Sequence, residues 1–139
     1  MDASQDEVQN PILRNLASWL SQQEKIQIAL VFGSFAKNTQ TSTSDLDLAC
    51  LFLEPLTIDQ QVEWIDRISR LTGREIDLID LSTATGTVLH EAVTNGVFLK
   101  KGSPEAFARI LKRMWLENED FEKQRQRILA ERRKKVFGG

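Results

Sequence analysis

The sequence contains little that could crosslink a chain or anchor it in a membrane. Cys50 is the single cysteine among 139 residues, which excludes an intrachain disulfide. No apolar run approaches the roughly 18 residues of a membrane span. The first residues include Asp2, Asp6 and Glu7 and have no apolar core of the signal-peptide type. We therefore expect a soluble, cytoplasmic protein that does not associate with a membrane.

The length and composition indicate one ordinary globular domain. With 41% apolar and 27% charged residues, the chain has material for one hydrophobic core but not for two. We expect an α/β fold in which a small mixed β-sheet is flanked by helices over residues 1–102. Residues 103–139 are expected to form a long C-terminal helix that packs on this domain and reaches a partner.

A glycine and a serine at the end of an apolar run are the first sign of a functional site. Residues 26–32 are rich in strand formers and stop at Gly33-Ser34, which predicts a buried strand leading into a turn. A short helical turn is expected over residues 35–38. Glycine lets backbone amides approach a phosphate closely, and a serine hydroxyl can add a hydrogen bond. The alternative is an ordinary surface turn.

Two aspartates open the next apolar run. The alternation of a strand places Asp45 and Asp47 on one face and Leu46 and Leu48 on the other. Residues two apart in a strand have Cα atoms roughly 6.5 Å apart, so both carboxylates can converge on one or two cations, as in two-metal phosphoryl-transfer sites. Hard oxygen ligands favour magnesium or manganese. The alternative is a pair of solubilising acids at the start of a strand.

The rest of the chain contains signals for several helices and two further strands. Asn10-Pro11 and Ser103-Pro104 are favourable helix starts, and Asp59 is a candidate cap for a helix that closes at Gly73. Residues 75–81 alternate acidic and apolar side chains and predict a third strand, followed by a helix over residues 85–94 and a short strand over residues 97–99. No proline or glycine occurs between residue 104 and Gly138, so one helix of about thirty residues is expected there.

The spacing of these residues resembles a known signature. Gly33-Ser34, ten residues and Asp45-x-Asp47 are similar to the motif of the DNA polymerase β-type nucleotidyltransferase superfamily. The phrase from Gly33 to Lys37, the short chain and residues 75–81 are most similar to the minimal nucleotidyltransferases, many of which are antitoxins of HEPN ribonuclease toxins. The resemblance covers about residues 10–100. It implies a polymerase β-like fold and magnesium-dependent transfer of AMP from ATP.

The resemblance also implies a role for individual residues. Asp77 is the expected third carboxylate, and Asp80 is the reserve, because a third acid of this family lies in a strand of this pattern. It could accept the proton of the attacking hydroxyl while helping to hold the catalytic metal. One departure is visible, since the family often has Arg-Gly where this chain has Lys37-Asn38, but asparagine tolerates a left-handed conformation. The implied catalytic and metal ligands are Asp45, Asp47 and Asp77, and the implied nucleotide-binding residues are Gly33, Ser34 and Lys37.

The expected activity is that of a protein adenylyltransferase acting as an antitoxin. AMP would be added to the hydroxyl of a tyrosine on a partner HEPN ribonuclease toxin. ATP would be the substrate and magnesium the cofactor. Two alternatives stay open: a non-catalytic protein that masks the toxin, and a nucleotidyltransferase acting on a small molecule.

Charge is unevenly distributed along the chain. Residues 122–139 carry seven Lys or Arg against two Glu, whereas the remainder is acidic. A basic tail on an acidic body favours contact with another macromolecule, or it is a solvated helix end that suits the helix dipole. We expect no direct nucleic-acid binding, because stacking aromatics are not interleaved with the basic residues.

Overall fold

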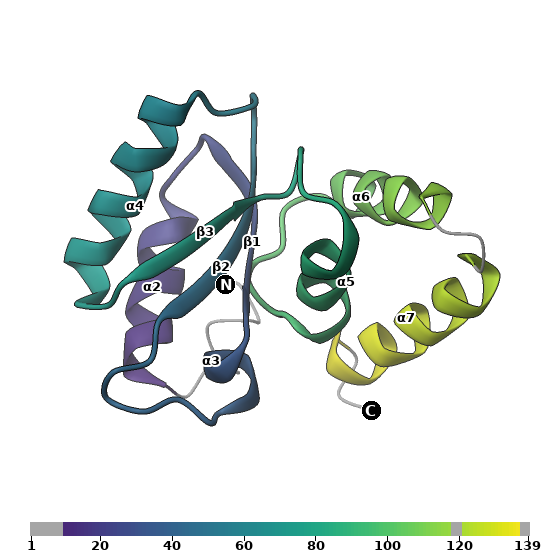
Figure 1. Cartoon of the computed structure of the whole chain (residues 1–139), viewed down its shortest axis with the longest axis horizontal. Helices are drawn as coiled ribbons and strands as arrows, with labels where there is room; N and C mark the ends of the chain where they lie inside the picture. Colours follow the sequence, from purple (N-terminus) through teal and green to yellow (C-terminus); the bar gives the residue numbers. More distant parts are fainter. Residues whose placement is uncertain (1–9, 118–120, 137–139) are drawn as a thin grey trace.

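Four strands form one mixed sheet at the centre of the molecule (Figure 1). The computed structural model describes residues 10–117 and 121–136. The strand order is β3-β2-β1-β4; β1 is antiparallel to β2 and to β4, and β2 is parallel to β3. Within the described ranges, no helix combines the length and the apolar character needed to cross a bilayer. The strands are β1 (Ile26–Phe32), β2 (Leu46–Phe52), β3 (Ile76–Asp80) and β4 (Val97–Lys100).

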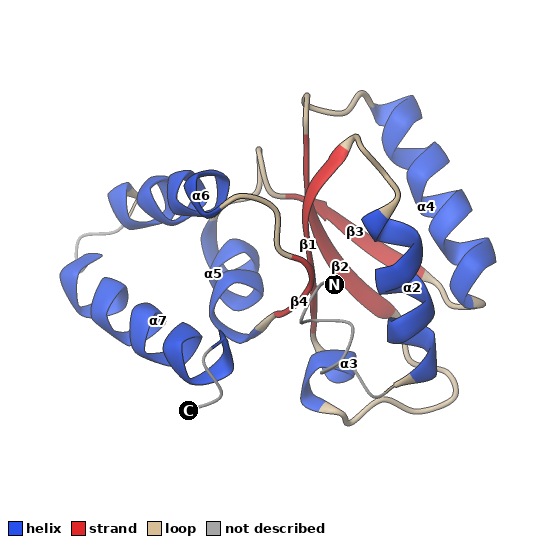
Figure 2. Ribbon diagram, turned by 180° about the vertical axis from the view of Figure 1, so that it is seen from behind, coloured by secondary structure: helices blue, strands red, loops and turns tan. Residues whose placement is uncertain are grey.

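The helices lie on both faces of this sheet (Figure 2). Helices α2 and α4 cover one face, and α5, α6 and α7 lie on the other. The expected α/β fold with helices flanking a small mixed sheet is therefore confirmed. The helices are α2 (Pro11–Ser21), α3 (Ser34–Lys37), α4 (Ile58–Thr72), α5 (Gly86–Asn95), α6 (Pro104–Leu116) and α7 (Phe121–Val136).

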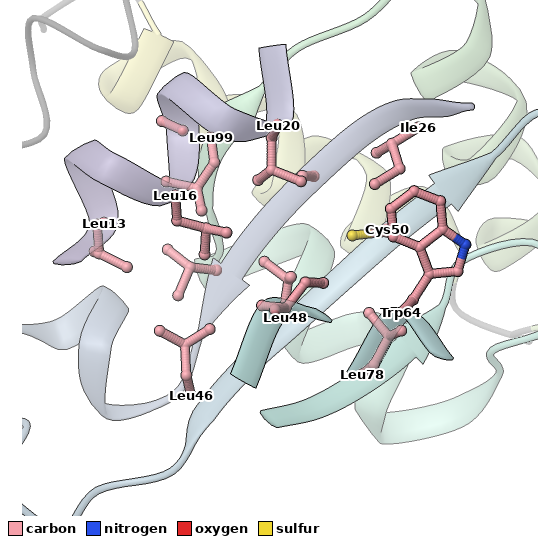
Figure 3. Packing of buried hydrophobic residues seen from close by; sticks show 14 of the residues in the cluster. Leu13, Leu16, Leu20, Ile26, Leu46, Leu48, Cys50, Trp64, Leu78 and Leu99 are labelled. Atoms are coloured by element: carbon pink, nitrogen blue, oxygen red, sulfur yellow. The ribbon is translucent and has the colours of Figure 1, made fainter. Parts of the chain in front are cut away.

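Strand β2 divides its side chains between two hydrophobic clusters, as the alternation predicts. Leu46, Leu48 and Cys50 are fully buried in the cluster beneath α2 and α4, whereas Ala49 belongs to the cluster beneath α5 and α6. Figure 3 shows the first cluster, into which the leucine side chains of α2 and β2 point. The face that carries Asp47 is thus the α5 and α6 face, and the opposite face anchors the strand.

Local capping explains where three helices begin. Asn10 Oδ1 and Ser103 Oγ each accept a hydrogen bond from an amide in the first turn of α2 and α6, which confirms both predicted starts. The prediction that Asp59 caps α4 is wrong. Thr57 Oγ1 accepts from the Gln60 amide at 3.1 Å, and Gln60 Oε1 accepts from the Thr57 amide at 3.0 Å. This reciprocal capping box begins the helix two residues earlier and leaves Asp59 in its first turn.

Helix α4 buries the side that carries its tryptophan. Val62 and Leu71 are 60% and 41% exposed, whereas Trp64 and Ile68 are buried. The Trp64 ring packs edge-on against Trp19, with ring centroids 6.0 Å apart. The large indole determines which side of the helix faces the sheet, because it buries more apolar area than valine or leucine does.

The prediction of one continuous C-terminal helix is wrong. Helix α6 ends at Leu116, and α7 runs back along α5 and α6 rather than away from them (Figure 1); residues 118–120 lie outside the described residues. The reversal buries Ile128 completely, which a straight helix could not do. It also buries Arg132, which donates from Nε to the Val93 carbonyl at 2.6 Å and from Nη2 to the Ala92 carbonyl at 3.2 Å.

Candidate active site

The predicted site residues lie where three strand ends meet. Phe32, the last residue of β1, pairs with Asp47 of the antiparallel β2. Asp47 in turn pairs with Asp77 of the parallel β3. Residues directly opposite each other in a sheet project from the same face. The turn at Gly33 and the carboxylates of Asp47 and Asp77 are therefore brought together, with Asp45 immediately before β2. We call Asp45, Asp47 and Asp77 the carboxylate site.

The three carboxylates of this site influence one another electrostatically. Burial raises the pKa of the half-buried Asp47, and the negative charges of Asp77 and Asp45 and a hydrogen bond with the Asp77 side chain raise it further. Asp45 and Asp77 are exposed. Like charges held this close favour the binding of a proton or a cation.

A metal ion fits this donor set chemically. Oxygen-only ligands of high negative charge suit magnesium and manganese. Within the described part of the chain, no three His, Cys, Asp or Glu side chains are already arranged so that they could hold a metal ion. Asp45 and Asp77 face solvent, so rotation of their side chains toward a bound cation costs little.

Gly33 fits its place for two separate reasons. Its backbone angles, φ 70° and ψ −147°, lie in a region that residues other than glycine rarely adopt. A Cβ atom at this position would lie only 2.1 Å from Asp47 Oδ2. The turn after β1 therefore passes directly against the carboxylate site. A substituent on residue 33 would push Asp47 aside.

The short helix α3 completes the turn. The Lys37 amide donates to the Gly33 carbonyl at 3.2 Å, and the Thr39 amide donates to the Ser34 carbonyl at 2.9 Å. Asn38 ends the helix in the left-handed conformation, with φ 58° and ψ 35°. This confirms the expectation that asparagine can stand where the resembled family has glycine.

Lys37 extends from this turn toward α5. Its Nζ lies 3.8 Å from Oε1 of Glu91, and Glu91 Oε2 accepts from Asn95 Nδ2 at 2.9 Å. The Lys37 side chain is 61% exposed, so a pair of this kind holds it weakly and leaves it able to reorient. Its role in nucleotide binding stays a prediction.

Asp80 lies apart from the carboxylate site. It pairs with Cys50, so it lies on the face of β3 opposite to Asp77. Its Oδ1 accepts from the Ser82 amide at 2.9 Å and from the Ser82 hydroxyl at 2.7 Å. The structure therefore brings Asp77, and not Asp80, next to Asp47.

Arg74 is the neighbour of the site that sequence reasoning missed. Its Nη1 donates to the Thr41 carbonyl at 2.8 Å and to the Ser44 carbonyl at 3.2 Å. Both acceptors are backbone atoms about thirty residues earlier, and a backbone acceptor leaves no signature in the sequence. No spacing pattern could have identified this contact.

Sequence comparison with known proteins finds one family model and several relatives that are similar to this chain. A family model described as "Polymerase beta, Nucleotidyltransferase" matches residues 14–105. MJ0126 of Methanocaldococcus jannaschii is 35% identical over 68 residues, which are 49% of this chain and 69% of that protein. The protein adenylyltransferase MntA of Shewanella oneidensis is 31% identical over 72 residues, 52% of either chain. The alignment to MntA thus covers about half of that relative.

Solved structures share the fold. A chain of a toxin–antitoxin complex with AMP-PNP superposes with a TM-score of 0.67 at 24% identity, covering 85% of this chain and 95% of that chain. A chain of the complex between the tri-AMPylated HEPN toxin and the MNT antitoxin of Shewanella oneidensis gives a TM-score of 0.61 at 20% identity, covering 86% and 93%. The likeness includes nearly the whole length of both neighbours.

Proposed function

Because this chain belongs to the polymerase beta nucleotidyltransferase family, we propose that it is a magnesium-dependent protein adenylyltransferase. It transfers AMP from ATP to a hydroxyl of another protein. The observation that carries the proposal is the meeting of Gly33, Asp47 and Asp77 at neighbouring strand ends, beside Asp45. A glycine turn for phosphates and a carboxylate cluster for cations are the two parts that nucleotidyl transfer needs.

Each residue has a distinct part in the reaction. Asp45 and Asp47 would hold two magnesium ions, and Asp77 would hold one of them and accept the proton of the attacking hydroxyl. Bound magnesium supplies positive charge against the triphosphate. The backbone at Gly33, the Ser34 hydroxyl and Lys37 bind and orient the phosphates. The bond between the acceptor oxygen and the α-phosphorus forms, the bond from the α-phosphorus to the β-phosphate oxygen breaks, and pyrophosphate leaves.

The acceptor belongs to a partner, which we propose to be a HEPN-type toxin that the modification inactivates. Support comes from the adenylyltransferase relative MntA and from the structural neighbour in complex with a tri-AMPylated HEPN toxin. The chain itself contains no tyrosine. If tyrosine is the acceptor, it lies outside these 139 residues.

The decisive experiment is intact-mass spectrometry of the partner toxin after incubation with this protein, ATP and magnesium. We expect mass increments of whole AMP units, and no increment with the Asp47→Asn variant. An unmodified toxin in a stable complex with the wild-type protein would refute the proposal. If an Asp45→Asn, Asp47→Asn double variant still neutralised the toxin fully, the protein would act by masking it.

A further inference from the structure

The loop that carries Asp45 into the site is held by one distant side chain. Residues 39–45 link α3 to β2, and their side chains are mostly polar and exposed. Within the loop, the Thr41 amide donates to Ser44 Oγ at 2.8 Å, and the Ser44 amide donates to the Thr41 carbonyl at 3.2 Å. These bonds make a closed turn, but they do not attach it to the sheet.

Arg74 makes that attachment. Its guanidinium donates to both carbonyls at the ends of the turn, those of Thr41 and Ser44. The Ser44 carbonyl belongs to the peptide group that joins it to Asp45. On the other side of Asp45, the Leu46 amide donates to the Glu75 carbonyl at 2.9 Å. The backbone is therefore held on both sides of Asp45, by the side chain of Arg74 on one side and by the carbonyl of Glu75 on the other.

The same guanidinium also contacts α3, the short helix that follows the Gly33-Ser34 turn. It lies over the ring of Phe35, 5.3 Å from the centroid, and Phe35 is a buried residue of α3. Phe35 directly follows Ser34. One planar cation thus contacts both the element expected to bind phosphate and the loop expected to bind metal.

The backbone of Arg74 is itself fixed. Ser69 Oγ donates to the Arg74 carbonyl at 2.8 Å, and the Arg74 amide donates to Thr72 Oγ1 at 3.3 Å. Gly73 takes the left-handed conformation that ends α4 and turns the chain toward β3. The guanidinium is therefore presented from a rigid helix end.

We propose that Arg74 is a positioning residue for nucleotidyl transfer: it holds Asp45 and the Gly33-Ser34 turn in the relative placement that metal and triphosphate require. This inference rests on the proposed function. Lysine should replace arginine only in part, because its compact ammonium lacks the broad guanidinium that lies over the Phe35 ring while one of its nitrogens donates to the Thr41 and Ser44 carbonyls.

The test compares Arg74→Gln and Arg74→Lys with the control Arg70→Gln. Arg70 lies four residues earlier, in the last turn of α4, and its only described ion pair is an exposed one with Asp66. Hydrogen exchange, measured without ATP or metal, should be faster over residues 39–46 in Arg74→Gln and unchanged in Arg70→Gln. Binding of Mn²⁺, followed by electron paramagnetic resonance, should weaken about 10- to 100-fold in Arg74→Gln, which is the usual effect of losing a residue that orients a metal ligand.

Transfer should fall by a similar factor of about 10 to 100, with a rise in the magnesium concentration that gives half-maximal rate. Arg74→Lys should lie between wild type and Arg74→Gln, and it carries the test if the glutamine variant does not fold. Wild-type metal binding and transfer in the folded variants would overturn the proposal, even with faster exchange. If the wild-type protein transferred no AMP, the proposed function would fail, whereas exchange and Mn²⁺ binding would still decide the role of Arg74.

Discussion

Replacing Asp47 with asparagine should stabilise the protein while it abolishes transfer. In the folded chain Asp47 is half-buried beside Asp77 and Asp45, and these surroundings raise its pKa. The folded state therefore holds the Asp47 proton more tightly than the unfolded state does. It loses stability as the pH rises through that raised pKa. Above that raised pKa the wild-type protein bears the full cost of this charge, and a neutral asparagine of the same shape does not.

The size of the gain follows from the geometry. Neighbouring strands lie about 4.8 Å apart, and two carboxylates at about 4 Å repel by about 1 kcal/mol in water and about 4 kcal/mol at an effective dielectric constant of 20. Asp45 and Asp77 are exposed, so the value near that of water applies. We expect Asp47→Asn to raise the free energy of unfolding by about 1 kcal/mol and the Tm by about 4 °C.

Thermal and urea unfolding at pH 7 with a chelator present would measure this gain. It should shrink as the pH is lowered toward 4, because the wild-type Asp47 then takes up its proton. Magnesium at ten times its Kd should stabilise only the wild-type protein, by about 1.4 kcal/mol. The control is Asp66→Asn, which removes an exposed carboxylate paired with Arg70 and should not stabilise. An Asp47→Asn variant less stable than wild type at pH 7 would refute the reasoning.

Two further substitutions test the turn and the C-terminal helix. Gly33→Ala should abolish transfer and cost about 2 kcal/mol of stability, because φ is positive and the new methyl would overlap Asp47 Oδ2. Mass spectrometry measures the loss of transfer, and urea unfolding measures the loss of stability. An active, stable variant would contradict the described turn. Arg132→Gln should cost about 2 kcal/mol, since buried charged hydrogen bonds to α5 are lost, whereas its exposed neighbour Arg133→Gln should change stability by less than about 0.5 kcal/mol. Equal effects of the two arginine substitutions in urea unfolding would argue against the docking of α7 on α5.

The sequence could predict those features that depend on neighbours along the chain. Strand β1 has the expected bounds, and the alternation in β2 separated Asp47 from Leu48 correctly, because burial on one face imposes a period of two. The choice of Asp77 over Asp80 followed a family resemblance, and the parallel register supplies its physical reason. The roles of these residues in catalysis and metal binding stay predictions.

Other features depend on contacts between segments far apart in the sequence. The reversal between α6 and α7 occurs without proline or glycine; the burial of Ile128 and Arg132 against α5 and α6 stabilises it. The sequence places Arg132 in a basic segment that suits either a solvated helix end or contact with a partner, yet its side chain donates to two carbonyls of α5. Arg74 is similar, since its partners are backbone carbonyls that any residue could supply.

The pairing of Asp47 with Asp77 means that the backbone hydrogen bonds between β2 and β3 determine the distance between these two acids. Their separation is set by the spacing of two hydrogen-bonded strands, and not by the conformation of the segment between them. The crossover through α4 can therefore lengthen or shorten during evolution without disturbing the two acids. A slip of β3 by a single residue would instead turn Asp77 to the opposite face and put an isoleucine or a leucine in its place. The register of β3, and not the length of the crossover, therefore decides whether Asp77 faces Asp47.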